Sequence, residues 1–195
     1  GLNVALDTAL QRLEEEDPQL KGCFVKGTFT ARNLAANDIK KIVDEVNKIN
    51  HKAFGEEKDL IGRVYEYFLK EFAVNATKEE GEFYTPHGPA QILCRIAMTG
   101  QEEKKGLQVY DPCMGSGSLM LSCRNYSKEP DYIKYYGQEL MPSTYNLARM
   151  NMFLHGVLPE NQHLRNGDTL DADWPTDEET EFDVVTMNPP YSAKW

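Results

Sequence analysis

The sequence has no apolar run near the ~20 residues that a membrane-spanning helix needs. Its first residues, Gly1-Leu2-Asn3-Val4, lack the basic segment and apolar stretch of a secretory signal. Cysteine is scarce, and the four present show neither CxxC pairing nor histidines at zinc-ligand spacing. We therefore expect a cytoplasmic protein with reduced thiols, no metal site and no membrane association.

An excess of positive charge is also missing. The 195 residues include 21 Lys and Arg against 31 Asp and Glu, which gives a formal net charge of −10. Proteins that hold duplex DNA over a wide surface need basic side chains to contact its phosphates. If nucleic acid is the substrate, we expect a partner or further sequence to supply much of that contact.

The first part of the chain, residues 1–80, is predicted to be helical. One helix is indicated by apolar residues at helical spacing, with Asn37 or Asp38 as its N-cap. Asp59 is expected to cap a second helix. The apolar positions of the two helices are Ile39, Ile42, Val43, Val46 and Ile49, and Ile61, Val64, Tyr65, Phe68, Leu69 and Phe72.

From residue 81 onward the pattern changes to alternating helices and strands. Helices are predicted from Pro86 to Gly100, from residue 117 to 123, and from Ser143, its expected cap, to residue 155. Strands are predicted at residues 107–110, 132–136, 163–165 and 182–187. This alternation is typical of an α/β fold with a parallel sheet of about four strands, in which ligands bind beyond the carboxyl ends of the strands.

The first predicted strand runs into a glycine loop, residues 111–118, with the sequence Asp-Pro-Cys-Met-Gly-Ser-Gly-Ser. Glycines let the backbone pass close to a ligand that faces the next helix N-terminus. The loop is not a P-loop, because no Gly-Lys-Ser/Thr follows, and Met120 occupies the third glycine position of GxGxxG. By itself the loop fits a structural turn as well as a ligand-binding loop.

Acidic residues follow the next two predicted strands. Glu139 lies about 20 residues after Gly117, the offset at which an acid accepts hydrogen bonds from ribose hydroxyls in dinucleotide folds. A solvent-exposed charge at a strand end is the alternative. Asp168, in Asn-Gly-Asp-Thr, could accept a hydrogen bond from an adenine amino group, although Asn-Gly-Asp is also an ordinary turn sequence.

The last predicted strand leads into Asn188-Pro189-Pro190-Tyr191. Asn188 presents a side-chain carbonyl, Pro189 presents a backbone carbonyl, and Pro190 has no N–H that could compete for either. Tyr191 adds a flat aromatic face, with a half-buried loop aromatic as the alternative interpretation. This Asn-Pro-Pro-Tyr turn suits a planar group that carries an exocyclic amine, which suggests a nucleobase.

Taken in order, these motifs resemble the amino-group DNA adenine methyltransferases, especially the modification subunits of type I restriction–modification systems. The resemblance runs from about Asp59 to Trp195. Asn-Pro-Pro-Tyr also occurs in methyltransferases that act on glutamine side chains or RNA bases, and Gly-Glu-Phe-Tyr-Thr-Pro at residues 81–86, ahead of the glycine loop, favours the DNA family.

The resemblance implies that the chain binds S-adenosylmethionine and methylates adenine N6 in DNA, together with a specificity subunit and a restriction subunit. The residues it assigns to the catalytic turn are Asn188, Pro189, Pro190 and Tyr191. The residues it assigns to the cofactor are Glu82, Phe83, Tyr84, Thr85, Pro86, His87, Asp111, Pro112, Gly115, Ser116, Gly117, Ser118, Glu139 and Asp168. Aromatic packing before a helix is the alternative for Phe83 and Tyr84.

The chain also departs from the family. Cys113-Met114 stands in the glycine loop where small residues are common, and the complete sheet of the family has more strands than this chain supplies. We therefore expect residues 81–195 to be a partial Rossmann-like methyltransferase domain that stops after the catalytic motif and is poorly active alone. Two alternatives remain open: a different acceptor, such as a glutamine amide or an RNA base, and a cofactor-binding or assembly module without turnover.

Overall fold

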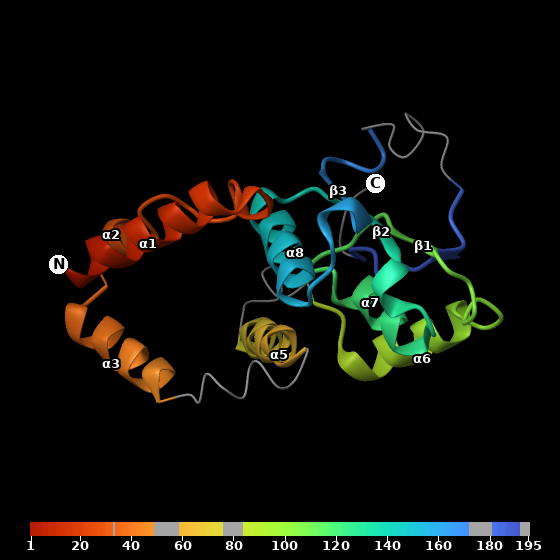
Figure 1. The fold of residues 1–195 in the computed structure, drawn as a ribbon, viewed down its shortest axis with the longest axis horizontal. Helices are drawn as coiled ribbons and strands as arrows, with labels where there is room; N and C mark the ends of the chain where they lie inside the picture. Colours follow the sequence, from red (N-terminus) through yellow and green to blue (C-terminus); the bar gives the residue numbers. More distant parts are fainter. Residues whose placement is uncertain (33, 49–58, 76–83, 172–180, 192–195) are drawn as a thin grey trace. The chain divides into compact units, whose positions relative to one another are not determined.

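The computed structural model describes residues 1–32, 34–48, 59–75, 84–171 and 181–191 (Figure 1). The chain forms two compact units, Gly1–Ile61 and Gly62–Trp195. The sequence pattern placed the end of the helical region at residue 80, whereas helix α5 (Leu60–Asn75) groups almost entirely with the second unit. Among the described residues, no helix is long and apolar enough to cross a bilayer.

The first unit is helical. Its elements are α1 (Leu2–Glu16), η1 (Pro18–Leu20), α2 (Thr28–Ala31) and α3 (Ala36–Asn47). Carboxylates of α1 accept backbone hydrogen bonds from the segment that follows: Asp7 from the N–H groups of Phe29 and Thr30, both at 3.0 Å, and Glu14 from that of Phe24 at 2.8 Å. The two Asp7 contacts fix the start of α2, because the first N–H groups of a helix have no partner within it, and the Glu14 contact holds the segment before it.

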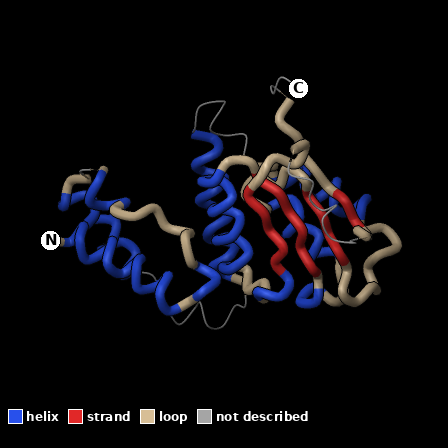
Figure 2. Tube along the Cα trace, turned by 90° about the horizontal axis from the view of Figure 1, so that it is seen from above, coloured by secondary structure: helices blue, strands red, loops and turns tan. Residues whose placement is uncertain are grey.

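The second unit is built on a four-stranded sheet, which confirms the predicted α/β class. Its strands are β1 (Gln108–Asp111), β2 (Lys134–Glu139), β3 (Gln162–Asn166) and β4 (Val184–Val185), in the order β3-β2-β1-β4. Every pairing is parallel. Figure 2 shows the strands side by side. Since all strands point the same way, their carboxyl ends meet at one edge of the sheet.

Helices pack against one face of this sheet. Val109, Tyr135 and Val184 point into a core that also contains side chains of α6 (His87–Ala97), α7 (Ser118–Leu121) and α8 (Pro142–Leu154). The opposite face carries an aromatic cluster: the ring of Tyr110 stacks on Phe182 with centroids 4.4 Å apart, and Tyr136 meets Phe182 edge-on at 5.1 Å. The connections between the strands also contain three short 3₁₀ helices, which are η2 (Ser122–Tyr126), η3 (Pro130–Tyr132) and η4 (Pro159–Asn161).

Several predicted element ends were wrong. Helix α8 begins at Pro142, one residue before Ser143, because proline has no N–H to leave unpaired and its φ already suits the first turn. Helix α3 begins at Ala36, so Asn37 and Asp38 lie inside its first turn and do not cap it; Ile49 lies outside the described residues. The helix after the glycine loop is only the four residues of α7 before it tightens into η2.

The strand predicted at residues 182–187 is also shorter than expected. Only Val184 and Val185 pair with β1 in register, opposite Val109 and Tyr110. Two further backbone bonds extend the contact, from the Asp183 N–H to the Gln108 carbonyl and from the Thr186 N–H to the Tyr110 carbonyl, both at 3.0 Å. The Asn-Pro-Pro-Tyr turn therefore begins two residues after the last backbone tie to the sheet.

Candidate functional site

The predicted motifs converge on the carboxyl edge of the sheet. Strand β1 ends at Asp111, β2 at Glu139 and β3 at Asn166, and Asn188 follows β4 by three residues. The register places Glu139 directly beside Asn166. Residues that are far apart in the sequence thus share one edge, where parallel sheets bind ligands.

The glycine loop requires glycine at two positions. Gly115 and Gly117 have φ values of 54° and 77°, a region that residues with a Cβ rarely adopt. A Cβ on Gly117 would also lie 3.2 Å from the Met152 side chain. The loop is fastened to β2 by the Met114 N–H, which donates to the Gln138 carbonyl at 3.0 Å. The predicted approach of this loop to a ligand stays a prediction.

Asn151 on α8 supports the glycine loop through hydrogen bonds to two of its serines. This residue was not identified from the sequence. Its side chain is fully buried, and its amide donates to the Ser116 carbonyl at 3.0 Å and to the Ser118 hydroxyl at 3.3 Å. The two serine hydroxyls are 3.1 Å apart. An Asn between two methionines in the last turns of the helix, in Arg-Met-Asn-Met-Phe, is the signal that could have identified it.

The unusual Cys113-Met114 pair is accommodated by a glycine in β2. Met114 is buried, and its Sδ would lie only 2.5 Å from a Cβ placed on Gly137. Gly137 therefore leaves the space that the larger methionine occupies. Cys113 is half-buried beside the acids of the site. Burial, followed by the charges of Asp111, Glu139 and Asp168, raises the pKa of its thiol.

Two carboxylates at this edge have raised pKa values. Burial of Asp111, which is only 1% exposed, raises its pKa to about 7, although the Cys113 N–H donates to it at 2.9 Å. Burial also raises the pKa of Glu139, whose two oxygens accept the N–H groups of Gly115 at 3.2 Å and Met141 at 2.8 Å. A carboxylate has about four acceptor positions, so Glu139 can still accept bonds from a ligand.

The loop after β3 is joined to the neighbouring motifs. The Asn166 amide donates to the Glu139 carbonyl at 2.7 Å, and the Thr169 hydroxyl donates to the Pro112 carbonyl. Asp168 is exposed, and its carboxylate accepts the Leu170 N–H at 3.0 Å, as in a turn. Its predicted role toward adenine stays a prediction, and the hydrogen bond of its neighbour Thr169 to Pro112 places it near the glycine loop.

Part of the Gly-Glu-Phe-Tyr-Thr-Pro element also lies at the carboxyl edge of the sheet. Glu82 and Phe83 lie outside the described residues. Burial, with the charge of Glu66, raises the pKa of Tyr84. Thr85 meets the Asn-Pro-Pro-Tyr turn, because the Asn188 amide nitrogen lies 3.4 Å from its hydroxyl oxygen. Pro86 is the N-cap residue of α6, and the helix starts at His87.

The Asn-Pro-Pro-Tyr turn is far more open than the glycine loop. Asn188 and Pro189 are half-buried and Pro190 is exposed. The Tyr191 side chain is 87% exposed, so its ring face is accessible and not packed in a loop. Before the turn, Thr186 is buried, and among the described residues its hydroxyl has no hydrogen-bond partner.

Asp183, a second residue that sequence reading missed, anchors the start of β4. Its carboxylate accepts the Gln108 N–H at 2.9 Å and forms an ion pair with Lys104. Gln108 is the first residue of β1, so this contact sets the two strands in register at the end opposite the site. The signal was an acid immediately before an apolar run, Phe-Asp-Val-Val.

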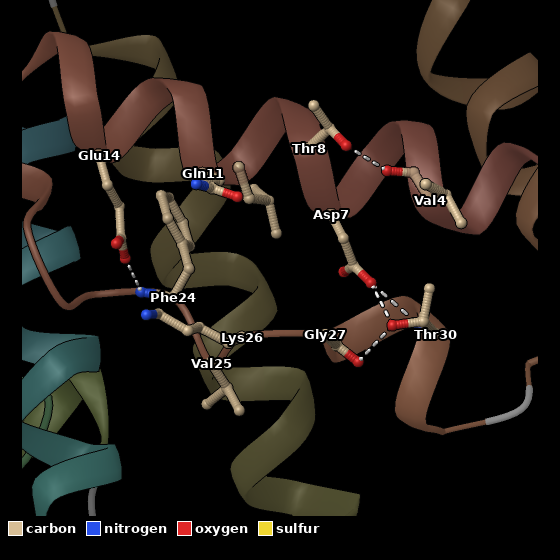
Figure 3. Close-up of a pocket in the computed structure, with 11 residues that line it drawn as sticks. Val4, Asp7, Thr8, Gln11, Glu14, Phe24, Val25, Lys26, Gly27 and Thr30 are labelled. Carbon is tan, nitrogen blue, oxygen red and sulfur yellow. Dashed lines mark hydrogen bonds between the residues drawn. The ribbon is translucent and has the colours of Figure 1, made fainter.

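The helical unit contains a pocket of about 270 Å³, which none of the predicted site residues lines. Figure 3 shows that the Asp7 and Glu14 carboxylates turn toward backbone and hydroxyl donors of the same unit. These acids are engaged in holding the loop between α1 and α2. The pocket is therefore explained by local packing.

Comparison with known proteins identifies relatives among the DNA methylases. The family model described as N-6 DNA Methylase matches residues 56–195. The methylase subunit of the type I restriction enzyme MpnII from Mycoplasma pneumoniae is 36% identical over 171 residues, covering 83% of this chain and 31% of its own length. The MjaIX methylase subunit from Methanocaldococcus jannaschii is 29% identical over 203 residues, covering 100% of this chain and 34% of its own length.

A solved structure is also similar throughout the chain. The crystal structure of a type I restriction–modification system methyltransferase subunit from Streptococcus thermophilus aligns with a TM-score of 0.83 and 42% identity. The alignment covers 99% of this chain and 42% of that one. The present chain thus spans about a third of the length of the curated relatives named above.

Proposed function

Because the chain belongs to the N-6 DNA methylase family, we propose that it supplies the cofactor site and the methyl-transfer turn of a DNA adenine-N6 methyltransferase. In this proposal the complete protein is the modification subunit of a type I restriction–modification system. One observation carries the proposal. The fold brings Asn188 to the sheet edge that also holds the glycine loop and Glu139, and it places Asn188 against Thr85.

The residues at the edge suit S-adenosylmethionine. Glu139 is a half-buried carboxylate with unused acceptor positions, as ribose hydroxyls require. Gly115 and Gly117 present backbone without side chains where the chain turns above the sheet. When bound, the cofactor supplies an electrophilic methyl group on a sulfonium. In this proposal Tyr84 to His87 and residues 111–118 surround it, and Asp168 contacts its adenine.

Asn188 and Pro189 would bind the acceptor. An adenine N6 amine is a poor nucleophile because its lone pair is delocalised into the ring. Hydrogen bonds from N6–H to the Asn188 Oδ1 and the Pro189 carbonyl favour a pyramidal nitrogen, and they strengthen as positive charge develops there. No strong base is needed before attack, since the amine is neutral. The chain's contribution is alignment of the amine with the methyl group.

Tyr191 would hold a base that has left the duplex. A base inside the helix cannot reach the sheet edge, and flipping it out costs a few kcal/mol. Stacking on an aromatic face returns about 1–3 kcal/mol. The 87% exposed ring of Tyr191 is accessible for this contact. Because the chain is acidic, we propose that a specificity subunit provides much of the DNA contact, and that a restriction subunit joins the complex.

Transfer of a labelled methyl group tests the function. The complete natural polypeptide carrying this sequence, with its partner subunits, should methylate adenine N6 in hemimethylated DNA and leave a glutamine-containing protein acceptor unlabelled. Asn188→Ala should remove transfer, because the acceptor of the N6 hydrogen bond is lost, while calorimetry should still detect cofactor binding. An Asn188→Ala enzyme with near wild-type turnover, or preferential labelling of the glutamine acceptor, would refute the assignment.

A further inference from the structure

Asn188 lies at the end of a weakly attached strand. Strand β4 contributes only Val184 and Val185 to the sheet, and the last backbone bond belongs to Thr186. Met187 is 53% exposed. Pro189 biases the Asn188 backbone toward an extended conformation, but it leaves the side-chain torsions free. The backbone therefore brings the amide to the site without fixing its direction.

A hydroxyl from a distant segment meets this amide. Thr85 lies two residues before α6, and its Oγ1 is 3.4 Å from the Asn188 Nδ2, which donates to it. Both residues are half-buried, so the contact is partly shielded from water. Helix α6 is itself fixed, because Ala90 and Cys94 are buried in the core against the sheet. Thr85 is thus attached to a more rigid element than Asn188 is.

The contact distinguishes the two ends of the amide. An Asn side chain has one carbonyl oxygen, which accepts, and one NH₂ group, which only donates. If Nδ2 is directed to Thr85, Oδ1 remains available on the other side. The acceptor amine needs that oxygen, because an NH₂ group facing an N6–H would place two donors together.

We propose that Thr85 is a positioning residue that orients the Asn188 amide, so that its oxygen faces the methyl acceptor. This inference rests on the proposed function. Thr85 acts on the transfer step through Asn188 and makes no contact with the acceptor itself. Its hydroxyl matters, and its methyl group does not.

Two substitutions separate the hydroxyl from the shape of the side chain. Thr85→Val keeps the shape and removes the oxygen, whereas Thr85→Ser keeps the oxygen. In the complete polypeptide with its partners, kcat should fall about 10- to 100-fold in Thr85→Val, the loss that a misplaced reacting group produces. Thr85→Ser should stay within about threefold of the unaltered protein, since the bond is retained. The KM for DNA should remain within about twofold in both variants. The Kd for S-adenosylmethionine should also change by no more than about twofold, because valine keeps the shape that Thr85 presents to the cofactor and serine keeps the hydroxyl.

A matched control tests for a general effect of replacing threonine. Thr99 follows α6, is exposed, and donates its hydroxyl to the Arg95 carbonyl at 3.0 Å. Thr99→Val should leave kcat unchanged. Circular dichroism and the Tm of each variant check folding, and Thr85→Ala provides a second variant without the hydroxyl if Thr85→Val does not fold.

Each other outcome has a definite meaning. Unchanged kcat in Thr85→Val overturns the inference and leaves the proposed function standing. A loss confined to cofactor affinity also overturns it, because Thr85 would then act as a cofactor contact. Equal damage in Thr85→Ser and Thr85→Val shows that packing and not the hydroxyl matters. Absence of methyl transfer by the unaltered protein overturns the proposed function and this inference together.

Discussion

The glycine loop and the Asn-Pro-Pro-Tyr turn lie at the same sheet edge but are built differently. Residues 114–118 of the loop are buried, and bonds from β2 and α8 hold them. The turn is half-buried to exposed, follows a two-residue strand, and contacts Thr85 through one side-chain bond of 3.4 Å. In the proposed function the loop would form the cofactor side of the site, which is thus largely preformed. The turn would form the acceptor side, which depends on a few contacts, as suits a place that must admit a base.

The largest effect is expected where the loop packs on β2. A Cβ at position 137 would lie 2.5 Å from the Met114 Sδ and 2.9 Å from the Met120 Cε. Gly137→Ala should therefore reduce the free energy of unfolding by about 3 kcal/mol, as overpacked cores do. Urea denaturation of the chain measures this change.

The Gly137→Ala effect should depend on Met114. In the double variant Gly137→Ala with Met114→Ala, part of the lost stability should return, because the clashing sulfur is gone. Gly88→Ala is a matched control, since a Cβ there meets nothing within 4 Å. Equal losses in Gly137→Ala and Gly88→Ala would show that the loop does not pack on β2 as described.

A smaller effect is expected where α8 supports the loop. Asn151→Ala removes two hydrogen bonds and leaves the buried Ser116 carbonyl without that donor. The loss should be about 2 kcal/mol of stability, typical of a buried group left unpaired. Calorimetry should show weaker binding of S-adenosylmethionine. Asn146→Ala on the same helix is the control, and similar cofactor binding in both variants would contradict a supporting role for Asn151.

The smallest effect is expected at the anchor of β4. Burial acts to raise the pKa of Asp183, but the hydrogen bonds from Lys104 and the Gln108 N–H outweigh it, so the pKa is lowered. Asp183→Asn should cost about 1 kcal/mol, the value of one charge-assisted bond at a partly exposed position. Since the folded pKa lies below the unfolded one, this stabilisation is present above the unfolded pKa and is lost as the pH falls through the folded pKa.

The contact between Asp183 and β1 also tests whether the Asn-Pro-Pro-Tyr turn can be disturbed without disturbing the glycine loop. In the complete methyltransferase that we propose, Asp183→Asn should lower kcat and leave cofactor affinity unchanged, because it loosens only the strand that carries Asn188. Asp131→Ala removes a longer ion pair, with Arg124 at 3.8 Å, in which the Asp131 side chain is 80% exposed, and it serves as control. If the Asp183 and Asp131 variants show the same melting temperatures from pH 3 to pH 7, the anchor contributes nothing measurable.

Much of this arrangement could be predicted from the sequence. Alternating apolar segments indicated the parallel sheet, and Glu139 and Asn188 were located because each follows a strand. The supporting contacts could not be predicted, since each joins segments that are far apart in the sequence and meet only in the folded chain. These contacts are Asn151 with Ser116, Met114 with Gly137, and Thr85 with Asn188. The length of β4 was overestimated because an apolar run shows burial and not hydrogen-bond pairing.

The strand order β3-β2-β1-β4 also has a consequence for how the unit folds. Strands β1, β2 and β3 pair with their sequence neighbours, so the part of the sheet that carries the glycine loop and Glu139 can assemble from one continuous stretch, residues 108–166. Strand β4 must return across the whole of that stretch to reach β1, which makes its pairing the most remote in sequence within the sheet. Contacts between segments that are remote in sequence tend to form late in folding, because closing the intervening loop costs conformational entropy. The turn that carries Asn188 is therefore expected to join the sheet last, and β1 keeps an open edge until it does.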